Sequence, residues 1–146
     1  MDTVAHILKE KGNQVHHTSP QTTVFHAVER MCALRVGAML VCEGGEPVGM
    51  FTERDLMTRV ILAGADPAVT RVGEVMSRDL VFVEPSTRAG EAMAVMTEKR
   101  CRHLPVMTEG KLAGMLSIGD VVRWLSRSQQ FEIQHLHDYI VGKYPG

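Results

Sequence analysis

The chain has 146 residues, of which 45% are hydrophobic and 23% are charged, the composition of an ordinary globular protein. Its 16 basic and 17 acidic residues nearly cancel, so it lacks the basic excess that is typical of nucleic-acid binders. We therefore expect no nucleic acid among its partners and, because no apolar run reaches the roughly 18 residues of a membrane span, no membrane either.

The first part of the chain predicts two helices, then a strand hairpin, then a third helix. The first helix stops at Gly12, and the polar segment after it is extended, since Ser19 precedes a proline. Thr22 or Thr23 can cap the second helix. The hairpin turns at residues 43–46, which read Glu-Gly-Gly-Glu. In chain order the expected elements are 3–11, 13–20 (extended), 22–34, 36–42, 47–51 and 52–62.

The second part of the chain repeats this order. Residues 49–55 (GMFTERD) return as residues 114–120 (GMLSIGD), and 114 minus 49 gives a spacing of 65 residues. A fixed period indicates a duplicated architecture. We place the first copy at 3–64, the second copy at 69–127 and a helical tail at 128–146. The elements expected in the second copy are 69–76, 80–83 (extended), 87–100, 104–107, 112–116 and 117–127.

In each copy, a hydroxyl residue stands where a predicted strand ends and a predicted helix begins. A carboxylate follows three positions later. We name Thr52–Asp55 the first opening and Ser117–Asp120 the second opening. The hydroxyl and the carboxylate can satisfy two free N–H groups of the helix start, as in a capping box. Alternatively, the free N–H groups and the hydroxyl can receive a phosphate while the carboxylate accepts from a sugar diol. Spacing alone does not decide between these interpretations.

The two copies resemble a tandem pair of CBS domains, the cystathionine-β-synthase-type repeat. The resemblance rests on the strand-Gly-apolar-apolar-[Ser/Thr]-x-x-Asp pattern of each copy and on residues 102–106 (RHLPV) and 73–76 (GEVM). It implies an α/β (α+β) fold in which two β-α-β-β-α repeats pack through their sheets into one module, followed by a C-terminal helix. It also implies two clefts between the repeats that bind AMP, ADP, ATP, S-adenosylmethionine or NAD(H).

The resemblance further implies a role for each matching residue. Asp55 and Asp120 would hold the ribose hydroxyls, and Thr52 and Ser117 would hold the phosphate. The stretches 36–39 and 102–104 would line the adenine and phosphate regions. The candidate binding residues are therefore Gly37, Ala38, Thr52, Arg54, Asp55, Arg102, His103, Leu104, Pro105, Ser117 and Asp120.

The two copies differ in charge around these positions. Arg102 and His103 stand where the first copy has Gly37 and Ala38, so the cationic candidates concentrate in the second copy. Arg102 and His103 are either phosphate ligands or ordinary surface residues at a strand start. Arg54 likewise either clamps a phosphate or lies on the exposed face of its helix.

No pattern in the chain predicts catalysis or a metal site. His16 and His17 would point to opposite faces of a strand, and His135 and His137 have the wrong spacing for one helix face. No candidate nucleophile has a partnered base, so we expect no enzyme. The three cysteines form no C-x-x-C pair and are expected to be free thiols that pack as small hydrophobes: Cys32, Cys42 and Cys101.

The resemblance implies a regulatory module that senses adenine nucleotides, with AMP as the leading ligand, and that signals to a separate protein. The N-terminal residues lack the charged-then-apolar pattern of a signal peptide, so we expect a cytoplasmic location. A homodimer is expected, because members of the family commonly pair. The first alternative is a protein-interaction scaffold with empty clefts. The weakest alternative is an enzyme or a metal-dependent redox protein built on histidine and cysteine.

Overall fold

The structure is a computed structural model that describes residues 2–128. The tail that follows, with its predicted helix and the pair His135 and His137, lies outside the described residues. The described chain has two compact units: one comprises Gln14–Phe82 with Glu109–Leu112, and the other comprises Val83–Thr108, the described N-terminal residues and the described residues from Ala113. Within residues 2–128, no helix has both the length and the apolar content that crossing a membrane requires.

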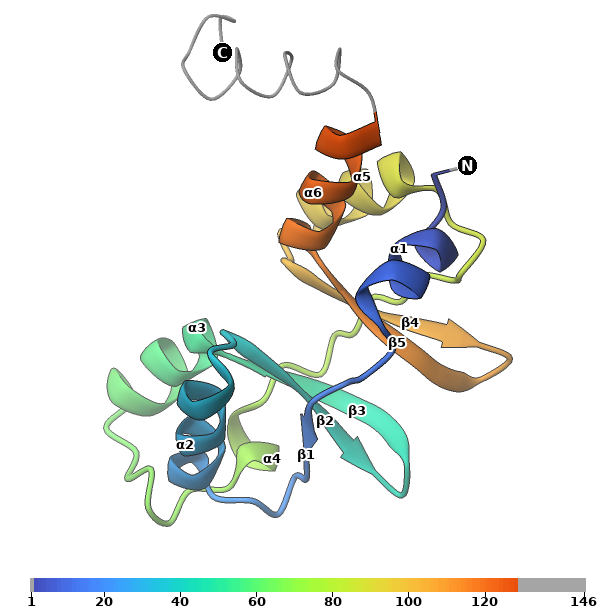
Figure 1. Cartoon of the computed structure of the whole chain (residues 1–146). Coiled ribbons are helices and arrows are strands. Elements are labelled where there is room, and N and C mark those ends of the chain that lie inside the picture. Colours follow the sequence, from blue (N-terminus) through green and yellow to red (C-terminus); the bar gives the residue numbers. More distant parts are fainter. Residues whose placement is uncertain (1, 129–146) are drawn as a thin grey trace, which may run out of the picture. The chain divides into compact units, whose positions relative to one another are not determined.

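The unit that contains the first copy, which we call the first-copy unit, is built on a three-stranded sheet in the order β1-β2-β3. Strand β1 runs parallel to β2, and β2 and β3 form the predicted antiparallel hairpin. Helices α2, α4 and the α3–η1 segment accompany this sheet (Figure 1). The bounds are β1 His17–Thr18, α2 Val24–Leu34, β2 Ala38–Glu43, β3 Glu46–Thr52, α3 Glu53–Asp55, η1 Leu56–Ile61 and α4 Val72–Val75.

Local chemistry explains these elements. The Thr23 hydroxyl accepts a hydrogen bond from the backbone N–H of His26 and so caps α2, as its sequence predicts. Gly44 and Gly45 both have positive φ, which suits the tight turn between β2 and β3. A single apolar cluster fills the space between the sheet and the helices: Val24, Ala27, Met31, Met39, Val41, Phe51, Val60, Val72, Val75 and Met76.

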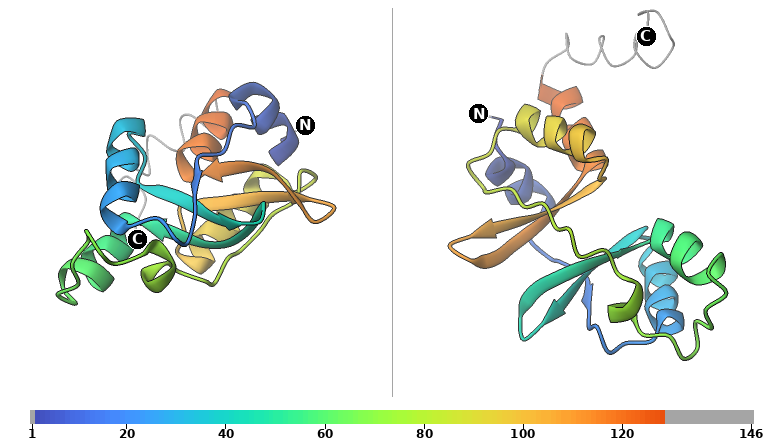
Figure 2. Two further views of the ribbon diagram at one scale, coloured as in Figure 1. Left: turned by 90° about the horizontal axis from the view of Figure 1, so that it is seen from below. Right: turned by 180° about the vertical axis from the view of Figure 1, so that it is seen from behind.

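The unit that contains the second copy, which we call the second-copy unit, has a two-stranded sheet in place of the three strands. Helices α1, α5 and α6 gather on one side of the β4–β5 hairpin, as the rear view in Figure 2 shows. Val83 makes only an isolated parallel bridge to Val106, where the first copy has a strand. The bounds are α1 Val4–Lys11, α5 Ala89–Lys99, β4 His103–Thr108, β5 Lys111–Ser117 and α6 Ile118–Ser128.

Each unit is completed by a short segment from the other copy of the sequence. The Val4 N–H at the start of α1 donates to the carbonyl of Thr87, at 2.8 Å. In the same way, the Val72 N–H at the start of α4 donates to the carbonyl of Thr22, at 2.8 Å. The compact units therefore do not coincide with the repeats of the sequence, because the short helix near the start of each repeat, α1 or α4, packs with the rest of the other repeat.

The mixed α/β class with two small sheets is confirmed, and three local predictions are wrong. The helix expected at 69–76 is a single turn. Before it, the chain turns at Asp66 and Arg71 bridges to Thr23; after it, Met50 and Ser77 exchange both backbone hydrogen bonds and draw the chain onto β3. The helix expected at 52–62 changes to π-helical bonding, in which the Leu62 N–H donates to the carbonyl of Met57. Cys32 is exposed, because α2 buries the face that carries Val24, Ala27 and Met31.

Candidate functional site

The first opening forms a capping box. Thr52 ends β3 in an extended conformation, and its hydroxyl accepts from the Asp55 N–H at 3.2 Å. The Thr52 N–H donates to Oδ2 of Asp55 at 3.0 Å, which completes the reciprocal pair. The capping interpretation of the sequence is therefore confirmed here. The capping box satisfies two of the roughly four backbone N–H groups that a helix start leaves without a partner inside the helix.

The other oxygen of the Asp55 carboxylate, Oδ1, faces the residues that follow α4. The Ser77 hydroxyl donates to Oδ1 at 2.9 Å. The Arg59 guanidinium approaches Oδ1 only to 3.8 Å, since it donates to the backbone carbonyl of Met76 at 3.0 Å. With 4% of its surface exposed, Asp55 is a buried carboxylate whose hydrogen bonds come mainly from neutral groups.

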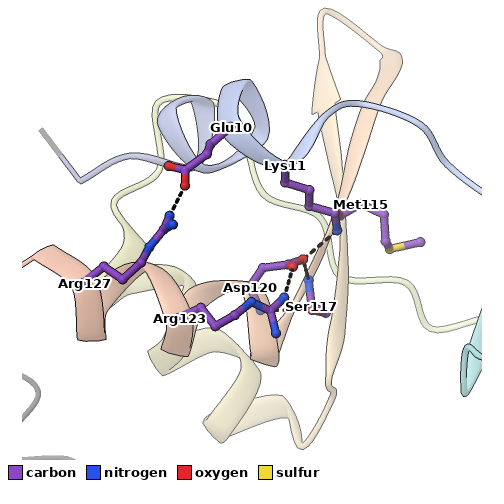
Figure 3. Close-up of polar contacts among 7 residues, drawn as sticks. All are labelled: Glu10, Lys11, Met115, Ser117, Asp120, Arg123 and Arg127. Carbon is purple, nitrogen blue, oxygen red and sulfur yellow. Dashed lines mark hydrogen bonds and ion pairs between the residues drawn. The ribbon is translucent and has the colours of Figure 1, made fainter.

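The second opening repeats the capping box with different residues. The Ser117 N–H donates to Oδ2 of Asp120 at 2.8 Å, and the Ser117 hydroxyl accepts from the Asp120 N–H at 3.1 Å. Asp120 is buried as Asp55 is, with 9% of its surface exposed. Figure 3 shows this carboxylate at the start of α6, facing the end of α1.

Asp120 differs from Asp55 in having two cations on its oxygens. The Lys11 ammonium donates to Oδ2 at 2.6 Å and also to the backbone carbonyl of Met115 at 2.6 Å. The Arg123 guanidinium donates to Oδ1 at 2.8 Å. Burial raises the pKa of the Asp120 carboxyl, but the hydrogen bonds from Lys11 and Ser117 and the charge of Lys11 outweigh it, so the pKa lies below its ordinary 3.8.

A pocket of about 290 Å³ opens beside the second opening, between α1 and α6. Three cationic side chains line it, namely Lys11, Arg123 and Arg127, together with the indole of Trp124. Arg127 is paired with Glu10 across the pocket (Figure 3). A pocket of about 350 Å³ in the first-copy unit includes neither Thr52 nor Asp55 among its lining residues. Only the second opening therefore contributes its carboxylate to one of these pockets.

The structure brings the predicted strand starts up to the helix openings. The Glu53 N–H donates to the carbonyl of Gly37 at 3.0 Å, and the Ile118 N–H donates to the carbonyl of Arg102 at 2.9 Å. A side chain on Gly37 would meet Glu53, because a Cβ there would lie 2.1 Å from Oε1 of that residue. The first opening thus carries a carboxylate where the second has the exposed guanidinium of Arg102.

The remaining candidate residues have different surroundings. Ala38 and His103 begin strands β2 and β4 and are half-buried. Leu104 is fully buried and Pro105 is buried with it, so the side chains of both belong to the core. Arg54 is exposed on α3. A ligand-binding role for these residues stays a prediction.

Two partners of the carboxylates were absent from the sequence-based prediction: Lys11 and Ser77. Each lies in or just after the short helix near the start of a copy, and each reaches a carboxylate more than 20 residues away along the chain. No local spacing connects such residues, so no sequence signal pointed to them. Arg59 and Arg123 carry a weak signal, because they stand four and three residues after their carboxylates, where helical side chains meet.

Comparison with known proteins gives matches over nearly the whole chain. The family model of the CBS domain matches twice, at residues 3–62 and 72–127. The CBS domain-containing protein CBSX3, mitochondrial, of Arabidopsis thaliana is 36% identical over 151 aligned residues, which cover 97% of this chain and 73% of that protein.

Two solved structures extend this similarity to three dimensions. A protein with CBS domains from Burkholderia ambifaria MC40-6 is 41% identical and has a TM-score of 0.83, over 87% of this chain and 96% of that one. CBSX2, solved in complex with AMP, is 26% identical and has a TM-score of 0.72, over 87% of this chain and 98% of that one.

Proposed function

Because this chain belongs to the CBS domain family, whose paired domains are generally regulatory modules that bind adenosine ligands, we propose that it binds an adenine nucleotide, with AMP as the first candidate. ADP, ATP, NAD(H) and S-adenosylmethionine are the other candidates. Thr52 and Asp55, and likewise Ser117 and Asp120, supply the hydroxyl and the carboxylate for the phosphate and the ribose. The binding of AMP by the similar protein CBSX2 supports this choice of ligand.

The observation that carries the proposal is the pair of buried carboxylates at equivalent helix starts. A buried carboxylate is costly unless it is hydrogen-bonded, and an apolar residue would fill either position at lower cost. Asp55 and Asp120 are nevertheless both present, each beside a hydroxyl and the free N–H groups of a helix start. This combination suits a ligand that presents a sugar diol and a phosphate on one molecule.

Binding would act on the conformation of the module and so on a regulated protein in trans or on a homodimer. A ligand shifts a conformational equilibrium only by the difference between its affinities for the two states. The regulatory output of this module therefore requires that AMP binds one arrangement of the two copies more tightly than another.

A thermal-shift series with AMP, ADP, ATP, NADH and S-adenosylmethionine tests the proposal. A ligand at 100 times its Kd adds about 2.7 kcal/mol to the free energy of unfolding, which raises the Tm by several degrees. We expect AMP to produce such a shift and the double variant Asp55→Ala/Asp120→Ala to abolish it. Unchanged melting temperatures with all five ligands would refute the proposal.

A protein-interaction scaffold is the second candidate function, and one observation favours it. Large apolar side chains are exposed on α2, on η1 and at the residue that follows η1: Phe25, Met57, Ile61 and Leu62, with 54%, 57%, 61% and 82% of their surfaces exposed. The two carboxylates also have partners within the chain itself. The same thermal-shift series separates the candidates, since a scaffold without a nucleotide site responds to none of the five ligands.

A further inference from the structure

Lys11 occupies the oxygen of Asp120 that a sugar diol needs. An ionised carboxylate has two oxygens with about four acceptor positions in total. On Oδ2 of Asp120 both positions are used, one by the Ser117 N–H and one by the Lys11 ammonium. On Oδ1 the Arg123 guanidinium uses one position. A vicinal diol that donates one hydrogen bond to each oxygen therefore finds room on Oδ1 but none on Oδ2.

Of the two donors on Oδ2, only Lys11 is free to move away. The Ser117 N–H is fixed by the capping box, since its donor belongs to the backbone at the end of β5. The Lys11 side chain has a flexible stem, is 32% exposed, and keeps a second acceptor in the carbonyl of Met115. A diol can therefore displace the ammonium from Asp120 without disturbing the start of α6.

The displaced ammonium lies in surroundings that suit an anion. The pocket between α1 and α6 is lined by three cations, Lys11, Arg123 and Arg127, and by two carboxylates, those of Asp120 and of Glu10, which pairs with Arg127, so cations exceed carboxylates by one. A phosphate carried by the incoming ligand would give the ammonium a new charged partner, and such charge-assisted hydrogen bonds are about twice as strong as neutral ones. An uncharged nucleoside would displace the same ammonium and offer nothing in exchange.

The first opening lacks this arrangement. The group on Oδ1 of Asp55 is the neutral hydroxyl of Ser77, and the nearest cation, Arg59, stays at 3.8 Å. A diol that displaces a hydroxyl leaves no uncompensated charge. Selection between a nucleotide and a nucleoside is therefore expected at the second opening and not at the first.

We propose that Lys11 is a specificity-determining residue of the second opening: it holds Asp120 while the site is empty, yields Asp120 to a ribose diol, and then pairs with the phosphate of the same ligand. This inference rests on the proposed nucleotide-binding function and adds to it the selection of phosphorylated over unphosphorylated adenosine. Lys11 thus opposes adenosine and favours AMP.

Calorimetric titration with AMP and with adenosine tests this role. The background variant Asp55→Ala removes the first opening, so that only the second opening reports. In that background we expect Lys11→Met to tighten adenosine binding about threefold and to weaken AMP binding about tenfold, so the preference for AMP over adenosine falls roughly thirtyfold. Lys11→Arg keeps the charge and should retain most of the preference.

Ser77→Ala, tested in an Asp120→Ala background, is the control from the first opening, because the Ser77 hydroxyl donates to Oδ1 of Asp55, the oxygen outside the capping box, without bringing a charge. It should change the affinities for AMP and adenosine by the same factor. Equal changes for both ligands in Lys11→Met would show that Lys11 is only structural, and this result would overturn the inference while leaving the proposed function intact. If the unmodified chain binds neither ligand, the proposed function fails and the inference fails with it.

Discussion

The first and second openings have the same backbone hydrogen bonds, yet their carboxylates meet different partners. Asp55 is held by the hydroxyl of Ser77, whereas Asp120 is held by the ammonium of Lys11 and the guanidinium of Arg123. The strand starts differ in the same sense, because Glu53 covers Gly37 in the first copy while Arg102 is exposed in the second. Duplication has thus kept the geometry of the helix start and altered the charge around it.

Because the charges around the two carboxylates differ, the two openings suit different ligands. A hydrogen-bonded carboxylate with a neutral partner suits a ligand whose nearby groups are uncharged. A carboxylate that shares its cations with an adjacent pocket suits a ligand with a negative group. Equivalent positions in a repeat therefore do not imply equivalent ligands.

The largest expected effect is a difference between the two carboxylates in how much each contributes to the free energy of unfolding. Asp120→Asn should lower the free energy of unfolding by about 2 kcal/mol, because hydrogen bonds to charged partners are the stronger ones. Asp55→Asn should lower it by about 1 kcal/mol, since its partners are mainly neutral. Urea unfolding of both variants measures this, with Asp79→Asn at an exposed position as the control. Equal losses in the two variants would remove the distinction between the openings.

A smaller effect is expected when the charge pattern of the second copy is transferred to the first. The double change Gly37→Arg/Glu53→Ile puts a guanidinium at the first opening and removes the carboxylate that occupies its space. In an Asp120→Ala background it should improve the Kd for AMP roughly fivefold, which is about 1 kcal/mol. The control is Gly37→Ala/Glu53→Ile, which makes the same space without the charge. If the alanine version binds AMP as well as the arginine version, charge is not the cause.

The smallest of the three effects is a dependence of stability on acid that belongs to the second opening. A carboxyl whose pKa is lowered on folding contributes stability above its unfolded pKa and loses that contribution as the pH falls through the folded pKa. For Asp120 this loss lies below the ordinary value of 3.8. The Tm between pH 6 and pH 3 should therefore fall less steeply in Lys11→Met than in the unmodified chain. Parallel curves would mean that Lys11 does not set this pKa.

The sequence was sufficient for the repeat, the hairpins and the capping boxes, because each depends on residues close together in the chain. Thr23 and the pair Gly44 and Gly45 have the local roles that their residue types predict. The one-turn α4 was not predictable in this way. Its end is decided by the pairing of Ser77 with Met50, and that pairing is a tertiary contact.

The candidate site was predictable in its hydroxyls and carboxylates but not in their charge partners. The pattern at 52–55 and 117–120 identifies four side chains and their mutual bonds. It cannot show that Lys11 rather than Arg102 holds Asp120, since Lys11 lies in the first copy, 109 residues before Asp120 in the chain. Whether the hydroxyls and carboxylates bind a nucleotide stays a prediction that the experiments above address.

The packing of α1 and α4, each with the rest of the other copy, has a consequence for how the chain folds during translation. Gln14–Phe82, with α4 at Val72–Val75, includes most of the first-copy unit and emerges from the ribosome as one continuous stretch. Helix α1 is translated earlier, but Thr87 and the surroundings that bind it are translated later. Since a helix of eight residues is marginal by itself in water, α1 remains without its docking site until the second half of the nascent chain is available. Helix α1 is therefore translated before most of its unit and folds among the last of its elements.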